Sequence, residues 1–387
     1  MKTSRRIAMA VAAVSVTLSQ GCSPVGSSHS DLRLAKSFFT PGAGELNPST
    51  DKRDADCAKA PEFDACLFDK NPVAQEGKAV DLEKWDQYRN FGVKIRGIVD
   101  SLHLENPYLQ VLTVSTPRIS LRETDRFKAP LSDKSSTAEQ LSAYYWANRA
   151  REYLARQVGE QRLPQSALKI YADDAFTGYS SGNRSIHLEK TPGRASKALS
   201  GEIVIQLFGQ ALADNLSGGR LFPGSSAQHK NCVKQPRGCC LSDLGCSQAL
   251  ATAFGDYVSG TLFPNSARLG ESLAGNVGGQ MLCQWPRDLS AIGNRSRANA
   301  FAACTSAPGH VTVLGAWYAA RWWNLRQAAK ALGPEAVADI DILFFEHARA
   351  WTGASTFADA RSAAIKAATD YKSGKYLELV SRTLTIN

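Results

Sequence analysis

The spacing of apolar residues changes near residue 197, and this change limits the chain to a fold with two different parts. Before it, apolar residues alternate with polar ones in Val93–Val99 and Tyr108–Val114, and short apolar runs follow at Leu168–Ala172 and Ser185–Leu188. Alternation with a period of two, and short apolar runs between turn residues, are typical of strands. We therefore expect a sheet in this part, with Ser185–Leu188 at the edge of a cleft.

Elsewhere apolar residues recur every three or four positions, which is the pattern of helices. One helix is expected among the strands, at Ser135–Gln157. Five more are expected after residue 197, at Ala198–Leu216, Ser247–Leu262, Val311–Leu332, Pro334–Thr352 and Phe357–Thr369. The pattern predicts an α+β fold, with a β-rich N-terminal lobe at residues 81–196 and a mainly helical C-terminal lobe at residues 197–387.

The first helix of the C-terminal lobe carries two glutamines that lie one helical turn apart. Within Glu202–Asp214, Gln206 and Gln210 have the spacing of the two histidines in the zinc-binding motif H-E-x-x-H. In that motif both imidazoles face one ion, and the glutamate is the general base. Leu207 stands at the position of that glutamate. Alone, the pattern Q-x-x-x-Q is uninformative, so its surroundings decide how it is interpreted.

Four blocks around this helix resemble the thermolysin-like zinc metallopeptidases (gluzincins), in the same order along the chain. They are Ser200–Gly218, Ala249–Asp256, Pro308–His310 and Thr356–Asp370, with weaker similarity at Ala143–Asn148 and Asp173–Phe176. The resemblance covers roughly residues 140–378. It implies a thermolysin-like fold, with the zinc helix between a β-rich and a helical lobe. The alternative is an unrelated helical bundle.

At the positions where the resemblance places the family's metal ligands, this chain has residues that do not ligate zinc. Gln206 and Gln210 stand where the family has its two histidines. Thr252 replaces the third ligand, a glutamate, and Leu207 replaces the general base. Neutral amide and hydroxyl oxygens bind Zn²⁺ poorly compared with imidazole or carboxylate, and without the metal no water is acidified. We therefore expect no zinc, no other cofactor and no peptidase activity, as in a pseudo-metallopeptidase.

Two supporting residues of the family pattern remain. Asp256 matches the aspartate that orients the first histidine, and His310 matches the histidine that stabilises the oxyanion. Both have ordinary alternatives, as a hydrogen-bond partner of Gln206 and as a helix-start residue. Gln206, Gln210 and Thr252 could then form a hydrogen-bonded network that fills the old metal cavity. The alternative function is a hydrolase or peptidase of altered chemistry that uses His310 and Asp256.

The chain begins like a bacterial secretory signal. Lys2, Arg5 and Arg6 precede an apolar stretch, residues 7–18, that is too short to span a bilayer. Residues 1–21 are therefore predicted to be a signal peptide.

The pair Gly21-Cys22 resembles the cleavage site of a bacterial lipoprotein, in which Cys22 would be acylated. Ser19 stands where such signals usually have leucine, so a plain signal peptide is the alternative. Ser23 after the cysteine implies the outer membrane, by analogy with bacterial lipoproteins. We expect a lipid-anchored protein of the cell envelope, facing the periplasm or the surface, with residues 22–80 as a flexible tether and small disulfide loop.

Eight cysteines besides Cys22 are expected to form disulfides, because an even number in an exported chain is typical of a disulfide framework. They are Cys57, Cys66, Cys232, Cys239, Cys240, Cys246, Cys283 and Cys304. Cys57–Cys66 would close a small loop and Cys283–Cys304 a larger one. The other four lie in a basic insertion, residues 220–246, that is expected beside the cleft. A Cys/His metal site in this insertion is the less favoured alternative.

The net charge and the absence of known binding motifs exclude few classes of function. The formal net charge of +9 falls to +6 when Lys2, Arg5 and Arg6 are removed with the signal peptide. A moderate positive charge suits anionic surfaces, but it serves solubility equally well. No basic run with interleaved aromatic residues indicates nucleic acid, and no phosphate-binding loop is present. We expect a catalytically inactive binding or scaffold protein of the envelope, with a peptide or protein ligand in the old cleft.

Overall fold

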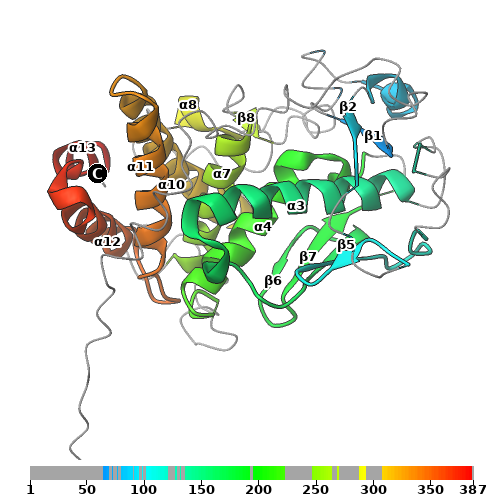
Figure 1. Cartoon of the computed structure of the whole chain (residues 1–387), viewed down its shortest axis with the longest axis horizontal. Helices are drawn as coiled ribbons and strands as arrows, with labels where there is room; N and C mark the ends of the chain where they lie inside the picture. The colour runs from blue at the N-terminus through cyan, green and yellow to red at the C-terminus, as the bar shows by residue number, and fades with distance from the viewer. Residues whose placement is uncertain are drawn as a thin grey trace, which may run out of the picture. The chain divides into compact units, whose positions relative to one another are not determined.

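A five-stranded mixed sheet forms the β-rich part of the structure (Figure 1). Its strands run in the order β3 (Glu105–Asn106), β4 (Leu109–Leu112), β5 (Leu168–Asp174), β7 (Ser185–Glu189) and β6 (Gly178–Ser180). The three central strands are parallel, and both edge strands are antiparallel to their neighbours. The predicted strand Ser185–Leu188 is present as β7, and a tight turn folds β6 back onto it, so that β6 is the edge strand of the sheet.

The computed structural model describes residues 64–68, 72, 76, 80–89, 91–95, 98, 102–120, 127–128, 131, 136–191, 195–222, 246–263, 268–269, 287–292 and 307–385. All of them belong to one compact unit, residues 39–387. The predicted signal peptide, the predicted acylation site Cys22 and residues 223–245 of the cysteine-rich insertion lie outside the described residues.

Helices α3 (Thr137–Val158) and α4 (Gly201–Leu216) pack on the sheet (Figure 1). Along β5 and β7, the fully buried Ile170, Ile186 and Leu188 alternate with the partly exposed Tyr171 and His187. Since successive side chains of a strand point to opposite faces, the buried set faces the helices. The fold is therefore α+β, as the sequence predicts.

Helix α7 (Ser247–Leu262) is the centre of the helical part and packs between α4 and α10 (Ala307–Lys330). Helix α11 (Pro334–Ala348) packs on α10 and α12 (Phe357–Asp370), and α13 (Leu377–Thr383) on α10 and α12. The predicted bounds of α7 and the predicted starts of α11 and α12 are confirmed. Proline at the first position starts α11, and a capping box between Thr356 and Asp359 starts α12.

Short elements connect these parts. They are β1 (Ala65–Leu67), η2 (Leu82–Tyr88), β2 (Phe91–Val93), η4 (Glu160–Arg162), η5 (Lys197–Leu199), β8 (Arg268–Leu269), β9 (Arg287–Asp288), α8 (Leu289–Ile292) and η7 (Tyr371–Gly374). Strands β1 and β2 pair with each other, as do β8 and β9. In the described part of the chain, no helix combines the length and apolar character needed to cross a bilayer.

The strand predicted at Val93–Val99 is wrong at its start. Strand β2 ends at Val93, and Lys94 and Ile95 have no strand structure. The amide of Ile95 instead donates a hydrogen bond to Asp64 Oδ2 at 2.9 Å. A side chain from a distant segment thus satisfies the backbone where a neighbouring strand was expected.

Two of the nine cysteines lie in the described residues. Cys66, in β1, is disulfide-bonded. Its predicted partner Cys57 lies outside the described residues, so this pairing stays a prediction. Cys246 is buried immediately before α7. The others, Cys22, Cys232, Cys239, Cys240, Cys283 and Cys304, also lie outside the description.

A buried ion pair joins four helices. Arg326 in α10 donates from Nε to Asp341 Oδ1 in α11 at 3.1 Å, and both side chains are almost fully buried. The hydroxyls of Tyr257 in α7 and Tyr153 in α3 also donate to this carboxylate, at 2.5 Å and 3.4 Å. Burial raises the pKa of Asp341, and these donors oppose the shift. One carboxylate is thus shared by α3, α7, α10 and α11.

Candidate functional site

Helices α4 and α7 approach each other so closely that only glycine fits at their contact. A Cβ added at Gly255 would lie 2.1 Å from the carbonyl oxygen of Gln206, and one added at Gly209 would lie 2.7 Å from Cα of Gly255. This contact brings α4, which carries the two glutamines, directly against α7, which carries Thr252 and Asp256.

Helix α10 also approaches α7 closely, at a third glycine. A Cβ added at Gly315 would lie 2.6 Å from the carbonyl oxygen of Ala249 and 2.7 Å from Cβ of Thr252. Residues from all three helices that carry predicted site positions therefore come together around α7. His310 lies in the first turn of α10, as predicted for a helix start, but its side chain is outside the description.

The positions that the resemblance aligns with zinc ligands are mostly hidden from solvent. Gln206, Leu207 and Thr252 have exposed fractions of 2%, 3% and 7%, and Asp256 is completely buried. Gln210 is half-buried. Apart from the undescribed His310 side chain, the predicted positions thus lie on two adjoining helices, within or at the margin of the protein interior.

The expected hydrogen-bonded network between these residues is not seen. The Thr252 hydroxyl donates to the carbonyl oxygen of Gln248, one turn earlier in its own helix, at 3.0 Å. Within the described residues, the side chains of Gln206 and Gln210 make no hydrogen bond to each other or to Thr252. The hydroxyl proton of Thr252 is therefore donated to the backbone of its own helix and is not available to the glutamines.

These donors do not fit a zinc ion. The side chains are two amides and one hydroxyl, which is already engaged, and none carries the negative charge or imidazole nitrogen that Zn²⁺ prefers. Leu207 supplies no base beside them. Among the residues that the structure describes, no three His, Cys, Asp or Glu side chains form a group that could hold a metal ion elsewhere.

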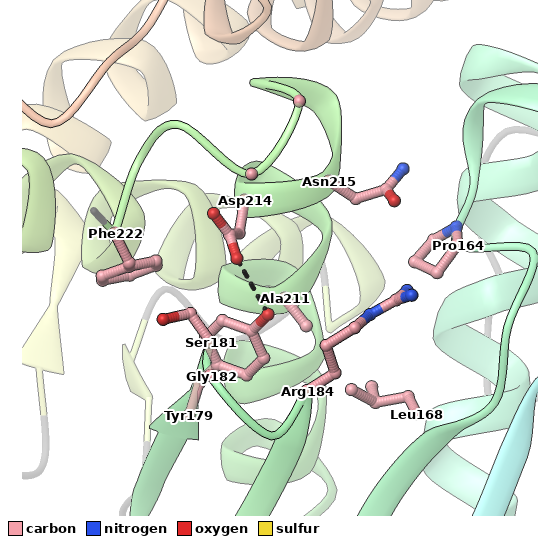
Figure 2. A pocket seen from close by; sticks show the side chains of 12 residues that line it. Pro164, Leu168, Tyr179, Ser181, Gly182, Arg184, Ala211, Asp214, Asn215 and Phe222 are labelled. Carbon is pink, nitrogen blue, oxygen red and sulfur yellow. Dashed lines mark hydrogen bonds between the residues drawn. The ribbon is translucent and has the colours of Figure 1, made fainter. Parts of the chain in front are cut away.

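A pocket of about 410 Å³ opens beside the C-terminal end of α4 (Figure 2). It lies between that helix end, the hairpin of β6 and β7, and the segment before β5. Its lining residues are Pro164, Leu168, Tyr179, Ser181, Gly182, Arg184, Ala211, Asp214, Asn215, Gly218, Gly219 and Phe222. Such a volume is within the usual range for small-ligand sites.

A tyrosine–aspartate pair crosses this pocket. The hydroxyl of Tyr179 in β6 donates to Asp214 Oδ2 in α4 at 3.0 Å (Figure 2). Burial raises the pKa of Asp214, although the hydrogen bond from Tyr179 and the amides of Phe222 and Leu221 oppose the shift. Burial and then the charge of Asp214 raise the pKa of Tyr179, so the phenol remains a donor.

Backbone conformation shapes the rest of the pocket. Gly218 and Gly219 follow α4 with φ of 69° and 72°, a left-handed conformation that favours glycine at helix ends. The amide of Gly219 donates to the carbonyl oxygen of Asp214 at 2.8 Å. Asn215 is held by a hydrogen bond from Nδ2 to the carbonyl oxygen of Arg162 at 3.0 Å. The Gly-Gly pair was the only sequence signal for this site.

A hydrogen-bonded chain of aspartate, histidine and serine lies elsewhere on the sheet and was not predicted from the sequence. His187 Nδ1 is 2.7 Å from Asp174 Oδ2, and its Nε2 is 2.8 Å from Ser185 Oγ. The imidazole stacks between Tyr171 and Phe176, with ring centroids 4.9 Å and 4.4 Å away. Ser185 is completely buried, so no substrate can reach its hydroxyl. The chain therefore holds His187 in the aromatic stack and does not form a catalytic triad.

Comparison with known proteins assigns no family. No protein-family model matches the chain. No curated protein is significantly similar to it.

Proposed function

We propose that this protein is a non-catalytic binding or scaffold lipoprotein of the bacterial envelope, built on a degenerate thermolysin-like metallopeptidase fold. The observation that carries the proposal is the state of the ligand positions. Gln206 and Thr252 are neutral and buried on two helices in direct contact, and the Thr252 hydroxyl is bound to its own helix. A hydrolytic metal site needs carboxylate, thiolate or imidazole ligands, and it needs one coordination position that a water molecule can occupy.

The edge strand β6 is the part of the fold that supports ligand binding. In the described sheet it pairs only with β7, and its residues are half-buried. An extended peptide can add to such an edge by main-chain hydrogen bonds, with its side chains alternating between the two faces. We propose that a peptide or an extended protein segment binds here. Acylation of Cys22 would hold this edge near the outer membrane.

The alternative, a hydrolase that uses Asp256 and His310, has less support. Asp256 is completely buried, and it follows Gly255, which contacts α4 directly. A general base must come within hydrogen-bond reach of the proton that it removes. A carboxylate in this position can orient neighbouring groups, but it cannot meet a substrate.

Zinc content and proteolysis together test the proposal. The full chain, purified in mild detergent without chelators, is expected to contain far less than one zinc per molecule. It is also expected to leave unfolded casein intact with or without added zinc. Stoichiometric zinc that disappears in Gln206→Ala, or casein cleavage that disappears in His310→Ala, would overturn it. A panel of extended peptides immobilised on beads then identifies the sequences that bind β6.

A further inference from the structure

We propose that the pocket at the end of α4 binds a small ligand with a primary ammonium group, which pairs with the carboxylate of Asp214. This goes beyond the proposed function, because it assigns a ligand to the pocket beside β6, which Tyr179 of that strand lines, and it does not depend on Gln206, Gln210 or Thr252.

Asp214 is a buried carboxylate that lacks a full set of partners. Its exposed fraction is 7%, and Oδ2 accepts one hydrogen bond from the neutral Tyr179 hydroxyl. Oδ1 is buried and accepts no hydrogen bond of normal geometry from the described residues, although the backbone amides of Leu221 and Phe222 lie near enough to lower the pKa of the carboxyl. Within that same part of the chain, Asp214 forms no ion pair. Buried carboxylates are normally paired or well hydrogen-bonded, so this one has capacity for a cationic donor.

The surroundings favour a cation at this point. Asp214 lies in the last turn of α4, where the helix dipole places partial negative charge. Arg184 is near enough to influence the carboxylate electrostatically, but its guanidinium donates to the hydroxyl of Ser166 instead. The pocket therefore offers an anionic carboxylate and a helix C terminus, without a basic side chain of the described residues bonded to either.

The other walls indicate an organic amine with a second polar end. Pro164, Leu168, Ala211 and Phe222 give apolar surface for a carbon skeleton. Arg184 extends along the pocket toward Asn215 and Pro164, away from the Tyr179–Asp214 pair (Figure 2). A guanidinium opposite a carboxylate suits a zwitterion. The ligand class is therefore a free amino acid or a short peptide with a free amino terminus.

Calorimetric titration of the full-length protein tests this assignment. The probes are the free amino acids and the dipeptide alanyl-alanine, with N-acetyl-alanyl-alanine as the amine-blocked control. Alanyl-alanine or at least one free amino acid is expected to bind. Acetylation of the dipeptide is expected to weaken its binding by about tenfold or more, because it removes the charge that Asp214 would pair with.

Matched variants distinguish the effect of losing the Asp214 carboxylate from a general loss of stability. Asp214→Asn keeps the shape and an acceptor for Tyr179, and it is expected to lower affinity by about tenfold or more. Asp370→Asn removes an exposed carboxylate on α12 and should bind like the wild type. Both variants should unfold at temperatures close to that of the wild type. Equal binding by wild type and Asp214→Asn, equal binding of blocked and free dipeptide, or no binding of any probe would overturn the proposal.

Discussion

The carbonyl oxygen of Gln206 occupies the space that a β-carbon at position 255 would need, 2.1 Å from where that atom would be. Backbone thus meets backbone between α4 and α7, with no flexible side chain that could move aside. The contact fixes how far apart the two helices lie at the level of Gln206 and Gly255. It also makes position 255 a direct test of whether the helices pack as described.

Gly255→Ala is expected to destabilise the protein strongly. A backbone oxygen cannot give way as a side-chain end can, so we expect a loss at or above the upper end of about 1–3 kcal/mol for overpacking. Chemical denaturation with a fluorescence readout measures the loss. Gly178→Ala is the control, because a Cβ there would meet nothing within 4 Å and should change stability by about 0.5 kcal/mol or less. Equal stability of both variants would show that α4 and α7 lie further apart.

Restoring the metal ligands tests the assignment of positions. The combined variant Gln206→His, Leu207→Glu, Gln210→His and Thr252→Glu is expected to bind about one zinc per chain, because it supplies two imidazoles and a carboxylate. Elemental analysis after dialysis measures the zinc. The same variant without Thr252→Glu should hold zinc less tightly. If neither protein retains zinc, the proposed correspondence of these positions with a zinc site is wrong, even if activity was never expected.

Acylation of Cys22 predicts where the protein is found after cell fractionation. The wild type should remain with the membranes, because a lipid chain contributes about 0.8 kcal/mol per buried methylene group. Cys22→Ser should move to the soluble periplasmic fraction. Labelling with a radioactive fatty acid gives an independent readout. Identical fractionation of the two proteins, with no label in either, would favour the plain signal peptide.

His347 predicts a dependence of stability on pH. Complete burial lowers its pKa from about 6.5 to about 3, while Nδ1 contacts the carbonyl oxygen of Phe344 at 2.6 Å. Because the folded-state pKa is below the unfolded one, the stabilisation is complete above pH 6.5 and is lost as pH falls toward 3. The expected slope from this one group is roughly 1.4 kcal/mol per pH unit.

Denaturant unfolding of wild type and His347→Gln at pH 7.5 and pH 5.5 measures this contribution. The variant is expected to be less stable at pH 7.5, because the ring packs against Trp322 with centroids 4.6 Å apart. It should lose less stability than the wild type between the two pH values. Parallel pH dependence in both proteins would mean that His347 is accessible to protons in the folded state.

The helices were largely predictable from the sequence, and the reason is local. Helix α7 begins and ends where its apolar periodicity does, and α12 begins at the capping box of Thr356 and Asp359. The short edge strand β6 was missed, because its three residues carry no alternation and its place depends on pairing with β7. Strand pairing depends on residues that are far apart in the sequence, so a short strand cannot be predicted from the local pattern of apolar residues.

The two parts of the candidate site differ in the same way. Gln206, Gln210 and Thr252 could be placed on facing helices, because each position follows from helical spacing and a resemblance. The pocket could not be predicted, since Tyr179 and Asp214 are 35 positions apart and meet only through the fold. Nothing in the composition around either residue indicates that the carboxylate is buried.

The carboxylate of Asp341 has a mechanical consequence. It takes hydrogen bonds from Tyr153 on α3, in the predicted N-terminal lobe, and from Tyr257 and Arg326, in the predicted C-terminal lobe. If either lobe opened alone, a charged group would stay in the protein interior without its partners. Local opening at this point is therefore disfavoured, and the two lobes should unfold in one cooperative step. Slow amide hydrogens of α3 and α7 should then exchange with deuterium through the same global event, as members of a single foldon.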